Sequence, residues 1–297
     1  MPESRARRSL TSRTLARVAL VGVTLLASHA AFGQIQVELK FPRLQFINHE
    51  PVYATIGITN LAGRDIELQD ADGQNWFGFD VTGSDGQLIT ATGPSSQAPL
   101  QIAAGQKVTQ KVNITPLFAI QDLGLYHVRA HLYFRDLGKY FYSPSRVIEV
   151  TDARPIWQQT VGVPDGAGPG GARTYSLMTN RFPDHTSLYV RVAEKESGIV
   201  YATYSLGRMI LFEDPKVQID QQNRLHVLHC AGPRMWSYAV IGINGELITH
   251  SSFSETKSRP HLVRGSEGAI DVHGGVLDVA VAPSEERKAP KLSDRPE

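Results

Sequence analysis

The chain has one cysteine, no surplus of charge of either sign, and a single long apolar run, which lies near its N-terminus. One cysteine cannot form an internal disulfide, so a hydrophobic core must stabilise the fold. The 297 residues carry 30 Lys and Arg against 29 Asp and Glu. Proteins that bind nucleic acid or anionic membranes usually carry a basic surplus, so we expect neither partner.

Residues 1–33 have the composition of a signal peptide. Five arginines precede the apolar run Val18–Leu26, and Ala31-Phe32-Gly33 supplies small residues at the positions that a signal peptidase reads. We expect cleavage near Gly33 and a periplasmic or extracellular product that starts at Gln34, with an uncleaved anchor as the alternative. Arg7-Arg8 fits a twin-arginine signal poorly, which favours the general secretory route.

The mature chain is expected to have no membrane span, because no later segment reaches the ~20 apolar residues that a bilayer requires. Residues 282–297 are charged, contain proline and lack periodicity, which predicts a disordered tail.

Residues 34–152 alternate apolar and polar side chains in short runs between Gly, Pro, Asn and Asp, the pattern of β-strands. About seven strands within about 115 residues is the size of an Ig-like β-sandwich. The polar run 107–114 is expected near a sheet edge. The predicted strands are 35–41, 52–59, two within 76–89, 100–102, 107–114, 122–134 and 146–150.

Asp122-x-Gly124-x-Tyr126 leads into the penultimate predicted strand, where such sandwiches place a tyrosine whose hydroxyl ties the strand to the preceding loop. Several turn motifs resemble those of Ig-like domains in bacterial exported proteins and, more faintly, the proteinase-inhibitor-like sandwich family of bacilli. The resemblance covers about Ile35 to Thr151, implies a fold and assigns no inhibitory residue. Its motifs are Glu50-Pro51-Val52, Asn60, Asp85-Gly86, Ala104-Gly105 and Gly124-Leu125-Tyr126.

Residues 153–173 are predicted to be a linker between two domains. Val161–Arg173 is rich in glycine but lacks the Lys-Ser/Thr ending of a P-loop, and the strand-like Thr174–Leu177 follows where a helix would be needed. A flexible linker or a long hairpin loop therefore explains it better than a phosphate site.

Residues 174–281 repeat themselves. Leu188-Tyr189-Val190 matches Leu225-His226-Val227 at an offset of 37 residues, and Pro215–Val227 matches Pro260–Val272 at an offset of 45. These periods have the scale of propeller blades, and the segment resembles the Asp-x-x-Asn/Gly-x-Leu-His-Val repeats of bacterial β-propellers. Closed propellers have at least four blades. We expect an all-β chain in which two to three open, blade-like units follow the sandwich, and a monomer, with closure by another chain as the alternative.

The stretch from Asp220 to Cys230 holds the densest group of chemistry-bearing side chains. On a strand, His226 and Cys230 face one side while His229 faces the other, so the three cannot converge on a metal as they could on a helix. We expect no metal and no cofactor, a buried free thiol at Cys230, and a hydrogen bond between His226 and a turn through Asp220.

Aromatic side chains near the turns of the repeats give the remaining functional signal. They predict either blade packing or a surface for an unknown protein or carbohydrate ligand. On the sandwich, His127, Arg129 and His131 share an outward face and form a second candidate surface. The predicted surface on the repeats comprises Trp236, Tyr238, Tyr201, His226 and Asp220.

Motifs of common hydrolases are missing from the sequence. Neither Gly-x-Ser-x-Gly nor His-Glu-x-x-His occurs, and no spacing singles out a pair of carboxylates. We therefore expect a non-enzymatic binding or scaffolding protein of the bacterial envelope. Two alternatives stay open: a glycan-directed hydrolase whose carboxylates come from loops, and an inhibitor-like Ig-fold protein.

Overall fold

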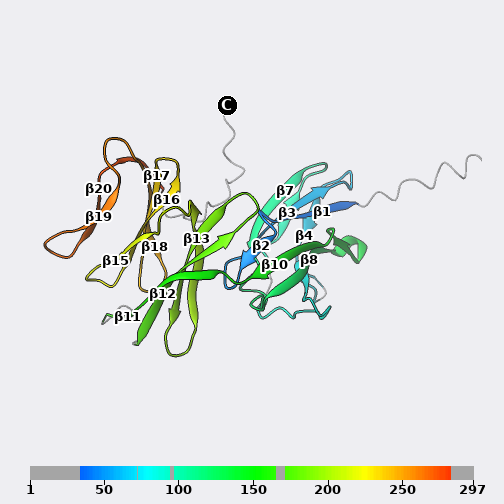
Figure 1. Ribbon diagram of the computed structural model, residues 1–297. Coiled ribbons are helices and arrows are strands. Elements are labelled where there is room, and N and C mark those ends of the chain that lie inside the picture. The colour runs from blue at the N-terminus through cyan, green and yellow to red at the C-terminus, as the bar shows by residue number, and fades with distance from the viewer. Residues whose placement is uncertain (1–33, 72, 94–96, 165–170, 282–297) are drawn as a thin grey trace, which may run out of the picture.

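The protein is built from β-strands throughout the part that the computed structural model describes, residues 34–71, 73–93, 97–164 and 171–281. The helical element among these residues is one short 3-10 turn, Arg135–Leu137. Strands β1–β10 form one half and β11–β21 the other, as Figure 1 shows. The predicted all-β class is confirmed. The predicted signal peptide at 1–33 and tail at 282–297 lie outside the described residues.

The first half is a sandwich of two sheets. One sheet has the order β1-β3-β7, and the facing sheet has the order β2-β10-β8-β5 with β9 also paired to β8. A small sheet, β4-β6, lies beside them. The bounds are β1 (Ile35–Lys40), β2 (Gln45–Ile47), β3 (Tyr53–Asn60), β4 (Ile66–Leu68), β5 (Phe77–Thr82), β6 (Leu100–Ile102), β7 (Lys107–Asn113), β8 (Gly124–Phe134), β9 (Lys139–Tyr142) and β10 (Arg146–Thr151).

Alternation along the strands builds the core between the two sheets. Every second residue of β8 from Tyr126 to Phe134 is buried, and these side chains pack against those of β1 and β3. Burying each such apolar side chain contributes roughly 1.5–3 kcal/mol. Strand β7 lies at an edge, as its polar sequence predicts. Residues 87–89 were predicted as a full strand but form only a short bridge to the end of β5.

Tyr126 forms the predicted tie between strand and loop, since its hydroxyl donates a hydrogen bond to the carbonyl of Asp122 at 2.7 Å. Tyr126→Phe removes this bond, so we expect a loss of about 1 kcal/mol in the free energy of unfolding in urea. Tyr53→Phe, at a half-buried tyrosine of β3, is the matched control and is expected to cost less than about 0.5 kcal/mol. Equal losses in the two variants would contradict the assignment.

The second half holds two larger antiparallel sheets and a hairpin. The sheet orders are β11-β12-β13-β14 and β15-β16-β17-β18-β21, and the hairpin is β19-β20. The bounds are β11 (Arg154–Gly162), β12 (Ala172–Arg181), β13 (Thr186–Glu194), β14 (Val200–Met209), β15 (Lys216–Ile219), β16 (Leu225–Gly232), β17 (Met235–Ile241), β18 (Leu247–Ser254), β19 (His261–Arg264), β20 (Ile270–His273) and β21 (Val276–Val281).

The predicted linker 153–173 is wrong over residues 154–162, which form β11 and pair with β12. This strand lies at a sheet edge and most of its side chains are exposed, so it lacks the apolar alternation by which a strand is recognised. Gly162 pairs with Ala172, so the described ends of the glycine-rich run Val161–Arg173 belong to a β11-β12 hairpin, the alternative to a flexible linker; residues 165–170 lie outside the described part. The blade-like region therefore begins at Arg154.

The 45-residue repeat is a repeat of hairpins. Val217 pairs with Val227 across β15 and β16, and Leu262 pairs with Val272 across β19 and β20 in the same register. The turns also correspond, because Asn223 and Gly268 both adopt a positive φ, 58° and 74°. The hairpin β19-β20 is thus the start of a further blade, but β21 returns to pair with β18. The result is a set of open blade-like units, as predicted.

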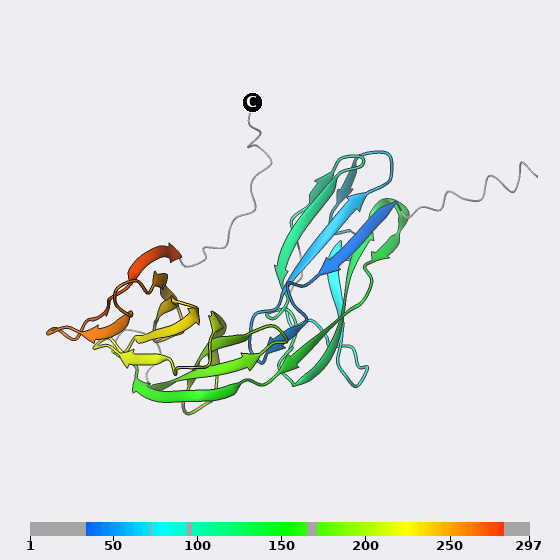
Figure 2. The same cartoon turned by 45° about the horizontal axis from the view of Figure 1, so that its top comes forward.

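The two halves meet where β2 contacts the first blade, the sheet β11-β12-β13-β14 (Figure 2). Arg43 donates a hydrogen bond to the hydroxyl of Tyr189 at 2.8 Å, and Arg191 donates to the carbonyl of Asn48 at 2.6 Å. Ile47 packs in the same cluster as Tyr189. These contacts join residues more than 140 positions apart in sequence. None of the described residues belongs to a helix with the length and apolar character needed to cross a membrane.

Candidate functional site

The five residues predicted as a binding surface on the repeats do not form a surface. Only Tyr201, on β14, is exposed, to 37%, and its ring lies over the guanidinium of Arg173 at 4.3 Å. That guanidinium is fully buried and pairs with Glu194 at 3.2 Å, so Tyr201 covers a structural ion pair. The other four are exposed to 4%, 3%, 2% and 9%, respectively: Asp220, His226, Trp236 and Tyr238.

Asp220 organises the turn between β15 and β16. One carboxylate oxygen accepts the amides of Gln222 and Arg224 at 2.9 and 2.8 Å, and the other accepts Arg224 Nε at 2.6 Å and lies 3.1 Å from His226 Nε2. His226 Nδ1 lies 2.7 Å from the Tyr238 hydroxyl. The predicted bond between His226 and Asp220 is confirmed. Burial raises the pKa of Asp220, but the turn amide and the two basic side chains outweigh it and hold the pKa below its usual value.

Strand β16 separates its polar side chains onto two faces, as predicted. Leu225 and Val227 join the core shared with the first blade, whereas Leu228 and Cys230 pack toward the β19-β20 hairpin. Cys230 is buried, and burial raises the pKa of its thiol, which makes it a poor nucleophile. Among the described residues, no three or more His, Cys, Asp or Glu side chains are grouped so that they could hold a metal ion.

A connected polar and aromatic cluster lies on the outer face of the sandwich sheet. Cross-strand pairing brings Asp80 of β5 opposite Arg129 of β8, and His131 of β8 opposite Tyr142 of β9. Side chains of directly paired residues lie on one face, close enough to interact. We call this cluster the tyrosine face; its members are Asp80, His127, Arg129, His131, Tyr133, Tyr140 and Tyr142.

Arg129 is held from two sides. Its Nε and Nη2 donate to one oxygen of Asp80 at 3.1 and 2.6 Å, and its guanidinium carbon lies 4.1 Å from the centre of the Tyr142 ring. Arginine stacks in this way on aromatic rings and keeps its donors in a fixed plane. Within the described part of the chain no group accepts a hydrogen bond from Nη1. That donor is therefore oriented and available to a ligand.

His131 lies between the acidic and the aromatic parts of the tyrosine face. Its Nδ1 is 3.1 Å from Asp80, and its ring contacts Tyr140 and Tyr142 edge-on at 5.6 and 6.1 Å between centroids. Burial lowers the pKa of His131 against the opposing effect of Asp80, which favours the neutral ring. Gly78 makes room for it, because a Cβ there would lie 2.5 Å from His131 Nε2.

The tyrosines form a row along β8 and β9. The rings of Tyr140 and Tyr142 are inclined by 28° with centroids 6.1 Å apart, and Tyr133 lies 5.1 Å from Tyr140. Tyr140 and Tyr142 are 38% and 47% exposed. The Tyr140 hydroxyl donates to Gln74 Oε1 at 2.5 Å, which fixes that ring. Tyrosines with an exposed ring and a polar tip are common at binding surfaces.

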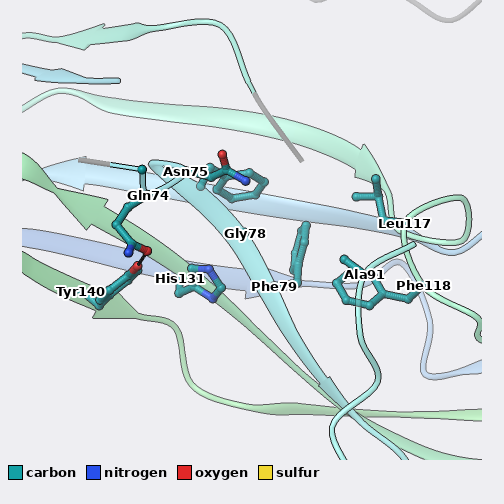
Figure 3. A pocket seen from close by; sticks show the side chains of 11 residues that line it. Gln74, Asn75, Gly78, Phe79, Ala91, Leu117, Phe118, His131 and Tyr140 are labelled. Atoms are coloured by element: carbon teal, nitrogen blue, oxygen red, sulfur yellow. Dashed lines mark hydrogen bonds between the residues drawn. The ribbon is translucent and has the colours of Figure 1, made fainter. Parts of the chain in front are cut away.

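Two hollows flank the tyrosine face. The first, of about 280 Å³, lies beside β5. Figure 3 shows Gln74, His131 and Tyr140 at one end of it and Phe79, Ala91, Leu117 and Phe118 at the other. The second, of about 420 Å³, is lined by Asp80, Thr82, Leu88, His127, Arg129 and Ser145. Both lie near the lower end of the size range of small-ligand sites. The tyrosine face lines both hollows.

Alternation in the sequence predicts that His127, Arg129 and His131 share the outward face of one strand. The structure brings Arg129 and His131 together with Asp80. The same signal was available for Tyr140 and Tyr142, which alternate in Lys139–Tyr142. Asp80 could not be found in this way. Its contact with Arg129 depends on the register between β5 and β8, 49 residues apart.

Comparisons with known proteins leave this geometry as the main guide to function. No protein-family model and no curated protein matches the chain. Three chains of solved structures match; one is the sporulation control protein Spo0M from Bacillus subtilis, at 10% identity over 58% of this chain and 91% of that chain, with a TM-score of 0.29. A similarity this weak carries no argument about the function of this chain.

Proposed function

We propose that this chain is an exported binding protein of the bacterial envelope and that the tyrosine face is its ligand site. The observation that supports this most is the fixed position of Arg129, clamped between Asp80 and Tyr142 with Nη1 left without an acceptor in the described chain. Side chains that are already ordered lose little conformational entropy when a ligand binds, so more of the contact energy appears as affinity.

The composition of the tyrosine face favours binding over hydrolysis. A glycosidase needs two carboxyl groups about 5–9.5 Å apart, one acting as an acid. The tyrosine face contributes one carboxylate, Asp80, which is occupied by Arg129 and His131. Neither hollow adds a second carboxylate to its lining. Tyrosine and arginine are instead the residues that dominate the energetics of protein interfaces.

Removal of Arg129 tests the site. The chain from Gln34 onward is immobilised and exposed to an envelope fraction, and the retained protein and polysaccharide are quantified. Arg129→Ala is expected to reduce the retained material at least tenfold, because it deletes the oriented donor and frees the Tyr142 ring. Tenfold corresponds to about 1.4 kcal/mol of binding free energy.

Lys111→Ala is the matched control, since the Lys111 ammonium lies over the Tyr53 ring at 4.5 Å on the opposite sheet of the same sandwich. It removes a cation from a tyrosine without touching the tyrosine face. Melting temperatures of both variants are measured to confirm folding. Equal retention by Arg129→Ala, Lys111→Ala and the unmodified chain would place the binding site elsewhere.

A further inference from the structure

We infer that the β19-β20 hairpin holds a site for one divalent transition-metal ion, with the imidazoles of His261 and His273 as its protein ligands. The two residues are paired directly opposite each other, both side chains are exposed, and their ring centroids are 6.3 Å apart. Directly opposite residues of an antiparallel pair share one face, with Cβ atoms about 4.5–5.5 Å apart. The hairpin therefore brings two imidazoles to one place on the surface. This site is separate from the tyrosine face and does not depend on the proposed function.

Both rings point away from the rest of the blade. Leu262 and Val272, which adjoin the two histidines in sequence, pack against the cluster that contains Trp236. Successive side chains of a strand point to opposite faces, so His261 and His273 face solvent. Figure 1 shows the hairpin at the outer end of the second half, where an ion from solution can reach it.

The ring of His261 is held in the orientation and tautomer that a metal ligand needs. Its Nδ1 lies 3.1 Å from the Arg259 carbonyl, which can only accept a hydrogen bond. In the neutral ring Nδ1 therefore carries the proton, and Nε2 presents its lone pair. Histidines that bind metals through one ring nitrogen almost always donate the other N–H in this way. Arg259 is itself fixed, because its guanidinium pairs with Glu213 at 3.0 Å and Glu255 at 3.4 Å.

The backbone beside His273 is fixed by the two glycines that follow it. Gly274 and Gly275 adopt positive φ angles of 77° and 67°, and the Gly275 amide donates to the Ser258 carbonyl at 3.1 Å. A Cβ at Gly274 would lie 2.5 Å from the Arg259 carbonyl oxygen, so this approach requires glycine. The separation of the two histidine backbones is thus set before a metal arrives, and binding has only to order the side chains.

The chemistry of the two rings selects a transition metal. Imidazole suits zinc, copper and nickel, whereas calcium and magnesium prefer oxygen ligands. Zn–N bonds of about 2.0–2.1 Å place the centroids of two shared imidazoles roughly 5 Å apart, so small side-chain rotations close the site. Within the described part of the chain, no hydrogen bond engages His261 Nε2 or either ring nitrogen of His273. Asp271 is exposed on the same face and adds negative charge, and water completes the coordination.

Titration calorimetry with zinc chloride tests the site on the chain from Gln34 onward. His261→Asn and His273→Asn are each expected to weaken zinc binding at least tenfold, because a chelate needs both rings. The double variant should bind no more weakly than either single variant, whereas independent ligands would give losses that add. His185→Asn is the matched control, since His185 is a partly exposed histidine on a different sheet, paired with Asp184, and its loss should leave binding unchanged.

A second measurement separates metal binding from folding. Melting temperatures of all variants without metal confirm that they fold. Zinc should raise the melting temperature of the unmodified chain and of His185→Asn, because it binds the folded hairpin, but not that of the double variant. Absence of zinc binding, equal affinities in all variants, or additive losses would overturn the inference. Retention of envelope material through Arg129 should persist in EDTA, so the metal site and the proposed function can each fail without the other.

Discussion

Asp220→Ala is expected to lower the free energy of unfolding by about 3–5 kcal/mol, measured by urea denaturation at pH 7. The Asp220 carboxylate is fully buried, accepts the backbone amides of Gln222 and Arg224, and pairs with the side chains of Arg224 and His226. Alanine leaves each of these donors without its acceptor, and a buried donor left unpaired costs about 1–3 kcal/mol. The turn and the hydrogen bond between His226 and Tyr238 should loosen together.

Asp184→Ala provides a matched control for this loss. Asp184 also pairs with a histidine, His185, at 2.8 Å, but its side chain is 83% exposed. Exposed ion pairs are worth little because water solvates both partners, so we expect a change below about 0.5 kcal/mol. Asp220→Asn retains one acceptor and should lie between the two. A loss at Asp220 no larger than at Asp184 would show that the buried network does not stabilise the blade.

The parts of the fold that local alternation determines could be predicted from the sequence. Strand β8 and the opposite directions of His226 and His229 follow from a period of two, and the tie from Tyr126 follows from the Asp122-x-Gly124-x-Tyr126 motif. The 45-residue repeat emerges because equivalent hairpins need the same apolar pair and the same left-handed turn residue.

The parts that depend on tertiary neighbours could not be predicted. Trp236 and Tyr238 were assigned to a candidate surface because aromatic side chains gather near the turns of the repeats, with blade packing as the alternative. The structure favours packing, because the β19-β20 hairpin covers the face that the first blade leaves open. Strand β11 escaped recognition because an exposed edge strand needs no apolar pattern. The tyrosine face could be predicted only by knowing that β5 pairs with β8 and β8 with β9. Alternation within one strand does not specify which strands are neighbours.

Acid is expected to destabilise the protein through His229, on the opposite face of β16 from His226. Burial lowers the pKa of His229 from 6.5 to about 4, and its Nε2 lies 3.2 Å from the Arg208 carbonyl. The unfolded chain therefore binds a proton near pH 6.5 that the folded chain resists until about pH 4. The free energy of unfolding is therefore highest above pH 6.5, and the His229 contribution should lower it by about 3 kcal/mol between pH 6.5 and pH 4. Below pH 4 His229 is protonated in both states and should cause no further loss.

His229→Gln isolates this contribution, because glutamine can donate to the same carbonyl but does not titrate. The variant should lose stability at pH 7 through imperfect packing, yet its unfolding free energy should fall by about 3 kcal/mol less than that of the unmodified chain between pH 7 and 4. His49, His131, His226 and His250, whose pKa values burial also lowers, contribute to the remaining slope. His127→Gln, at an exposed histidine, is the control and should keep the full slope. An unchanged slope in His229→Gln would mean that the acid sensitivity arises from the other buried histidines.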